Sequence, residues 1–217
     1  MVSKYVILAK SNDKTFDIPR QLIEINGEPL IKRTIRLLKE NGVKNIIITA
    51  NDERFNNLGV KVYNGKTDNF DYIERTGYWL DAFPFELMNE PVCFIWGDVY
   101  FSEDAIREIV ELESKKDLFF CTYENKTDKY IKEYDEPLAY KVMNCERFKN
   151  HINKVKKMKD EGKCCREPII WEVYRSMHGL DINTHLMTTD FIAINDESCD
   201  IDSAKDVELL KEKLGGE

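Results

Sequence analysis

The sequence predicts an α/β fold: a three-layer α/β/α sandwich in which helices cover both faces of a mostly parallel, mixed sheet. Short runs such as Lys44–Ala50 and Val92–Asp98 are continuously apolar, as is typical of parallel strands buried on both faces. Segments with helical spacing alternate with these runs along the chain. The 217 residues are 42% hydrophobic, which is enough to build a substantial core.

The first half of the chain alternates strands and helices regularly. Pro29 stands where the first helix should begin, and Gly42 follows its last apolar residues. Ser102 precedes two acidic residues and is a suitable N-cap for a later helix. Another helix is expected within residues 77–88, where Pro84 should bend or interrupt it. Strands are expected at residues 4–9, 44–50, 60–64, 92–98 and 117–123.

The second half is less regular. Ser203 and Asp206 have the spacing of a capping box in front of a last helix. No repeat, low-complexity linker or change of composition interrupts the chain, so we expect one domain over residues 1–217. The remaining expected elements are a strand at 137–143, helices at 146–162 and 167–177, and a single strand with alternating polarity at 187–195.

Composition and charge exclude several classes of protein. A net charge of −8 argues against a general nucleic-acid binder, which needs a basic surface. No apolar run is long enough to span a bilayer, and the first residues do not resemble a secretory signal. Six cysteines lack the spacing of a disulfide framework or a zinc site. We therefore expect reduced thiols in a cytoplasmic protein without membrane association, and ordinary roles for the scattered His151, His178 and His185.

Polar features follow the expected strands where ligands of open α/β sheets bind, at the carboxyl ends. They are the loop after Ala9, the pair Gly97-Asp98, and the acids before the last helix, Asp200 and Asp202. Taken singly, such residues are usually turns and helix caps. Together, two carboxylates at one end of a sheet would suit a hard divalent ion such as Mg²⁺, which takes one or two protein carboxylates and completes its shell with water and phosphate oxygens.

Three stretches in order, "PRQLIEINGEPLI", "FIWGDVYF" and "DIDSAKDVELL", carry a family resemblance. They resemble the nucleotidyltransferases that make activated sugars and alcohols from a nucleoside triphosphate and a phosphorylated acceptor, a family that includes MobA-like NTP transferases. The resemblance implies a glycosyltransferase-A-like fold, that is, a Rossmann-like nucleotide-diphospho-sugar transferase fold. Residues that match the first motif are Pro19, Leu22, Gly27, Pro29, Leu30 and Ile31, with Arg20 in place of the family's lysine.

The resemblance also implies roles for single residues. Asp98 and Asp202 would bind the catalytic metal, Mg²⁺ or Mn²⁺, with Asp200 as the less favoured second candidate. Arg20 and Lys14 would stabilise the leaving pyrophosphate. The acceptor would be recognised within residues 123–188. By order along the chain, Lys141 and Arg166 are the cations best placed to bind it. The nucleotide would be bound by Ala9, Lys10, Ser11, Thr76, Gly77 and Asp98.

The loop after the first strand departs from the family pattern. Where the family has "A-A-G-x-G-x-R", this chain reads "AKSNDKT", with Ser11 and Asp13 in the positions of glycines. Glycines let backbone amides approach phosphates closely and allow positive φ. Asn and Asp tolerate such angles best among other residues, and Lys10, Lys14 and Arg20 could supply the missing positive charge. The alternative is that the loop no longer holds a triphosphate.

The expected function is transfer of a nucleoside monophosphate from an NTP to a small phosphorylated acceptor, with release of pyrophosphate. CTP is slightly favoured, because cytidylyltransferases of this fold often lack a trailing β-helix. Surface-polysaccharide or lipid-headgroup synthesis is the setting that the resemblance implies. A non-catalytic nucleotide-binding or regulatory protein is the first alternative. A metal-dependent glycosyltransferase is weaker, because the central strand ends in Gly-Asp-Val rather than Asp-x-Asp. The sequence leaves open the nucleobase, the acceptor and whether the protein is a homodimer.

Overall fold

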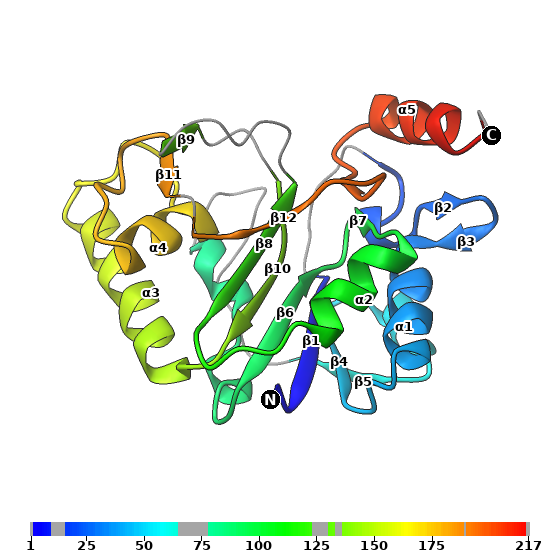
Figure 1. The fold of residues 1–217 in the computed structure, drawn as a ribbon, viewed down its shortest axis with the longest axis horizontal. Coiled ribbons are helices and arrows are strands. Elements are labelled where there is room, and N and C mark those ends of the chain that lie inside the picture. The colour runs from blue at the N-terminus through cyan, green and yellow to red at the C-terminus, as the bar shows by residue number, and fades with distance from the viewer. Residues whose placement is uncertain are drawn as a thin grey trace.

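A seven-stranded sheet forms the centre of the protein (Figure 1). The computed structural model describes residues 2–9, 16–64, 78–122, 130–132, 136–188 and 190–215. The strand order is β12-β8-β10-β6-β1-β4-β5, and β10 runs antiparallel to its neighbours while the other six share one direction. This confirms the mostly parallel, mixed sheet. Its strands are β1 (Lys4–Leu8), β4 (Ile46–Thr49), β5 (Lys61–Tyr63), β6 (Val92–Trp96), β8 (Leu118–Thr122), β10 (Pro137–Val142) and β12 (Ile192–Ile194).

Helices cover both faces of this sheet, as the sequence predicts (Figure 1). Helices α1 (Leu30–Glu40) and α2 (Glu103–Glu111) contact each other on one side, and α3 (Cys145–Asp160) and α4 (Ile170–Met177) contact each other on the other. Helix α5 (Ala204–Gly215) lies beyond the carboxyl end of the parallel strands. Among the helices of the described ranges, none combines the length and the apolar character that crossing a membrane would require.

The helix boundaries follow the signals in the sequence. Pro29 is the N-cap of α1, and Gly42 lies just after its end with φ of 80°. The Ser102 side chain accepts a hydrogen bond from the Ala105 amide at 2.9 Å and so caps α2. In front of α5, the amide of Asp206 donates to Ser203 Oγ while the Asp206 carboxylate accepts from the Ser203 amide. The capping box is thus confirmed.

Two expected elements are divided in the structure. The helix expected within residues 77–88 is replaced by two short 3₁₀ helices, η3 (Trp79–Ala82) and η4 (Phe85–Leu87), separated at Pro84. Proline has no amide hydrogen to continue a helix, so it starts the second turn instead. The strand expected at 187–195 is also two strands. β11 (Leu186–Thr188) pairs with β9 (Tyr130–Lys132) outside the main sheet, whereas β12 joins the main sheet beside β8.

Two small ladders lie near the carboxyl end of the sheet. A hairpin joins β2 (Glu24–Ile25) and β3 (Glu28–Pro29), and β7 (Val99–Tyr100) pairs with β13 (Cys199–Asp200). A hydrophobic cluster, separate from the main core, packs the hairpin, β7 and α5 together. It thereby fixes the C-terminal acids above the end of β6. The buried members of this cluster are Ile23, Ile25, Leu30, Tyr100, Ile201 and Leu210.

Candidate functional site

Asp98 leaves the sheet at the point where β6 passes closest to β1. The amide of Gly97 donates to the Leu8 carbonyl oxygen at 3.0 Å. A Cβ atom at position 97 would lie 2.7 Å from the same oxygen, which no ordinary contact allows. Glycine is therefore required here by close backbone approach rather than by an unusual φ angle. It sets the position from which Asp98 emerges.

The short pairing of β13 with β7 brings the C-terminal acids to Asp98. Asp200 stands opposite Val99 in this ladder, and the Ile201 amide donates to the Asp98 carbonyl oxygen at 3.1 Å. Asp202 follows immediately, and its amide donates to the Asp206 carboxylate at 3.1 Å. The backbone of the late acidic segment is thus held both by the strand and by the start of α5. Residues more than one hundred positions apart consequently meet at one edge.

Arg20 joins the two acids. It begins the short 3₁₀ helix η1 (Arg20–Leu22), and its Nη2 atom lies 3.2 Å from Asp98 Oδ2. Its Nη1 atom donates to Asp202 Oδ1 and, at 3.3 Å, to the Ile201 carbonyl oxygen. The side chains of Arg20 and Asp98 are each 14% exposed, whereas that of Asp202 is 66% exposed. The guanidinium therefore reaches from a sheltered carboxylate to one at the surface.

Two oxygen atoms beside this ion pair are shielded from solvent and have no hydrogen-bond partner among the described residues. They are Asp200 Oδ1 and Gln21 Oε1. Burial, followed by the negative charges of Asp98 and Glu136, raises the pKa of Asp200 to about 8, and the charge of Arg20 acts in the opposite direction. Nothing in the sequence pattern selects Gln21, because its burial beside Gly97 depends on tertiary packing. This edge thus keeps two shielded acceptor oxygens without a donor in the described part of the chain.

The oxygen-rich edge fits a hard cation. In the described part of the chain, no three His, Cys, Asp or Glu side chains converge as a ready metal centre. Asp98 and Asp202 are two carboxylates, however, and Mg²⁺ typically takes one or two from the protein and its remaining ligands from water and phosphate. Asp200 Oδ1 is a further shielded oxygen without a hydrogen-bond partner in the described residues. Donor type and charge therefore fit Mg²⁺ or Mn²⁺.

The expected nucleotide-binding loop is described only at its first residue. Ala9 is buried at the end of β1, and its amide donates to the Thr49 carbonyl oxygen at 3.0 Å. The other candidates from the loop and from the segment before η3 lie outside the described residues. They are Lys10, Ser11, Lys14, Thr76 and Gly77.

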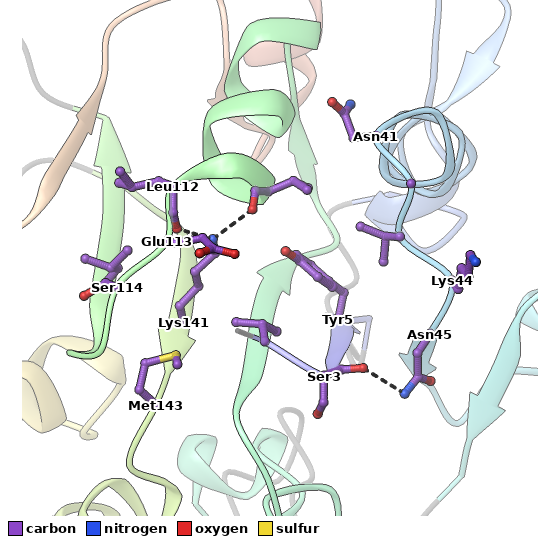
Figure 2. Close-up of a pocket in the computed structure, with 15 residues that line it drawn as sticks. Ser3, Tyr5, Asn41, Lys44, Asn45, Leu112, Glu113, Ser114, Lys141 and Met143 are labelled. Carbon is purple, nitrogen blue, oxygen red and sulfur yellow. Dashed lines mark hydrogen bonds between the residues drawn. The ribbon is translucent and has the colours of Figure 1, made fainter.

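Lys141 does not lie with the other candidates. In β10 it stands opposite Cys93, at the start of β6 and roughly 16 Å of strand from Asp98. Its buried ammonium group donates to the carbonyl oxygens of Val110, in the last turn of α2, at 3.2 Å and of Leu112, just after that helix, at 2.7 Å. Strand direction separates Lys141 from the carboxyl edge, because the late residues of the antiparallel β10 lie at the amino end of the sheet, and its expected role toward the acceptor stays a prediction. Figure 2 shows Lys141 there, beside a pocket of about 390 Å³ that Ser3, Tyr5, Asn45 and Glu113 also line.

Arg166 takes part in an ion cluster at the start of α4. Its Nε atom donates to Glu172 Oε1 at 2.8 Å, and that buried carboxylate also lies 3.2 Å from Arg175 Nη1. The other oxygen of Glu172 accepts from the Ile169 amide at 2.8 Å. Arg166 thus balances a buried charge near the helix N-terminus, and its role toward an acceptor stays a prediction.

Solved structures share this architecture. No protein-family profile and no curated protein sequence matches the chain. A CTP:phosphocholine cytidylyltransferase from Streptococcus pneumoniae is 20% identical with a TM-score of 0.55, over 97% of this chain and 98% of that one. A Bacillus anthracis protein assigned as a glucose-1-phosphate thymidylyltransferase, in complex with sucrose, is 14% identical with a TM-score of 0.61, over 97% and 94%. The chain therefore has the Rossmann-like nucleotide-diphospho-sugar transferase fold of these nucleotidyltransferases, the fold that its sequence resemblance implies.

Proposed function

We propose that this protein is a metal-dependent nucleotidyltransferase that transfers a nucleoside monophosphate from an NTP to a small phosphorylated acceptor. The observation that carries the proposal is the convergence of Arg20, Asp98 and Asp202 at the carboxyl edge of the sheet. The names of the two similar structures support it, since each pairs a nucleotidyl group with a phosphorylated acceptor. CTP is the favoured donor, in keeping with the sequence and with the first of these names.

Each residue of the site has a chemical role in this proposal. Asp98 and Asp202 would hold the ion, Mg²⁺ or Mn²⁺. When bound, the ion would neutralise charge on the phosphate oxygens. Arg20 is suited to grip phosphate oxygens with its planar, forked donors and so to stabilise the leaving pyrophosphate. The backbone around Ala9, at the end of β1, would form one wall for the base.

The reaction would need no general base. An oxygen of the acceptor phosphate, already anionic at neutral pH, attacks the α-phosphorus of the NTP. The bond from that phosphorus to the bridging oxygen breaks, and pyrophosphate leaves with the electron pair. Acceleration would come from holding two anionic reactants in line and from charge stabilisation by Arg20. The site needs positive charge and fixed positions rather than a proton acceptor.

Thermal melting tests the proposal first. The full-length protein is melted with CTP, UTP, GTP, ATP or dTTP, each with and without Mg²⁺. We expect one triphosphate to raise the melting temperature only with Mg²⁺, because a ligand that binds only the folded state stabilises it by about 2.7 kcal/mol at one hundred times its Kd. Pyrophosphate release with phosphocholine or glucose-1-phosphate then tests turnover.

Two variants make the test specific. Asp98→Asn should abolish the shift with nucleotide and Mg²⁺. Glu146→Gln, an exposed acid at the start of α3, should leave the shift unchanged. If no triphosphate shifts the melting temperature of the unmodified protein, the transferase proposal fails and the non-catalytic alternative replaces it.

A further inference from the structure

The guanidinium of Arg20 pairs with both acids that would hold the metal ion. Its Nη2 atom lies against Asp98 Oδ2, and its Nη1 atom against Asp202 Oδ1. A divalent ion held by both side chains would draw on these same carboxylates. A carboxylate oxygen pair that accepts from a guanidinium is a poorer ligand, and the guanidinium also repels a second cation. Arg20 and the ion therefore compete for one place.

We propose that Arg20 is a latch that closes the metal site in the nucleotide-free protein and opens when phosphates of the nucleotide take over its guanidinium. This inference rests on the proposed function, since it concerns regulation of the same site. Metal and nucleotide are then coupled through one side chain: each ligand favours the arrangement of Arg20 that admits the other. A metal ion or a nucleotide that binds alone must break the ion pairs of Arg20 with Asp98 and Asp202 and leaves one side of them without a partner. When both bind, the phosphates pair with Arg20 and the ion pairs with the two acids.

The chemistry of arginine suits a latch better than that of the family's lysine. Two different nitrogens of one planar group contact two different acids, which a compact ammonium group does less readily. The backbone at this point is held, because the Leu22 amide donates to the Pro19 carbonyl oxygen at 2.8 Å and the Ile23 amide to the Arg20 carbonyl oxygen at 3.0 Å. Opening thus requires the side chain of Arg20 to swing, without movement of η1.

The latch predicts whether removal of the Arg20 side chain strengthens or weakens metal binding. If Arg20 merely supported the acids, its removal would leave Asp98 and Asp202 less well placed and would weaken metal binding. If Arg20 competes with the ion, its removal strengthens metal binding. In the nucleotide-free protein we expect Arg20→Met to bind Mn²⁺ about tenfold more tightly than the unmodified protein, the scale of one lost charge-assisted hydrogen bond. Arg20→Lys should fall between the two.

The experiment is a Mn²⁺ titration of the full-length protein, followed by the electron paramagnetic resonance signal of free Mn²⁺. The double variant Arg20→Met with Asp98→Asn shows that the ion binds at this site, because it should lose the gained affinity. Thermal melting in EDTA establishes that each variant is folded. If Arg20→Met does not fold, the comparison of Arg20→Lys with the unmodified protein still shows whether Mn²⁺ binding becomes tighter or weaker.

Each outcome decides the question. Tighter Mn²⁺ binding by Arg20→Met or Arg20→Lys supports the latch. Equal or weaker binding overturns it, as does the lack of Mn²⁺ binding by every variant, which would mean that Asp98 and Asp202 do not form a metal site even without Arg20. The proposed function fails separately. A protein that binds no triphosphate can still show competition between Arg20 and Mn²⁺, and a protein with turnover can lack it.

Discussion

The two ends of the central sheet differ in how completely their buried polar groups are hydrogen-bonded. At the amino end, Lys141 donates to two carbonyl oxygens at the C-terminal end of α2, and the Asp117 carboxylate accepts from the amides of Met143 at 2.7 Å and Asn144 at 3.1 Å. At the carboxyl end, Asp200 retains a shielded oxygen without a partner in the described residues. Charges at the amino end complete the fold. At the carboxyl end, Arg20 is shared between Asp98 and Asp202, and the shielded oxygen of Asp200 keeps capacity to accept from a ligand.

The largest expected effect is on activity at the carboxyl end. Asp98→Asn removes the proposed metal ligand and one partner of Arg20, so we expect the rate of pyrophosphate release with CTP to fall by at least about one hundredfold. The melting temperature without ligands should change by only a few degrees, because the replacement has the same shape. A variant that keeps its activity would show that catalysis does not depend on this edge.

The next largest effect concerns the backbone beneath that edge. Gly97→Ala places a methyl group 2.7 Å from the Leu8 carbonyl oxygen, so β6 and β1 must separate. We expect the free energy of unfolding to fall by about 3 kcal/mol, measured by urea denaturation. Gly215→Ala is the matched control, because its new methyl group has nothing within 4 Å. Equal stability of the two variants would contradict the close approach.

Lys141→Met tests the amino end. It leaves the carbonyl oxygens of Val110 and Leu112 without their donor, which should lower the free energy of unfolding by about 2 kcal/mol. Binding of nucleotide with Mg²⁺ should stay within about twofold of the original, since the residue lies at the opposite end of the sheet. Loss of nucleotide binding in a folded variant would contradict the claim that Lys141 serves stability alone and the carboxyl end alone binds the nucleotide.

The βαβ pattern predicted the mostly parallel sheet and the place of Asp98 at its carboxyl edge. The family resemblance placed Asp202 with Asp98, and in the structure both acids contact Arg20. The sequence did not predict the place of Lys141, since an apolar strand pattern is the same in both directions and β10 is the reversed strand. Nor did it predict that Arg20 would contact both acids. That contact depends on η1 and on the pairing of β13 with β7, which involve long-range packing rather than local pattern.

The smallest expected effect is the pH dependence caused by Asp200. Its pKa of about 8 in the folded protein lies above the usual value for an aspartate, so the folded state favours the neutral acid. Its contribution to the free energy of unfolding is therefore complete below about pH 4 and is lost as the pH rises through 8. Asp200→Asn should remove this loss and stabilise the protein at pH 9 by about 1 kcal/mol, with allowance for screening by solvent. Urea denaturation in EDTA at pH 5 and pH 9 measures the difference, and a variant with the same pH dependence as the original would show that Asp200 is already ionised at the carboxyl end.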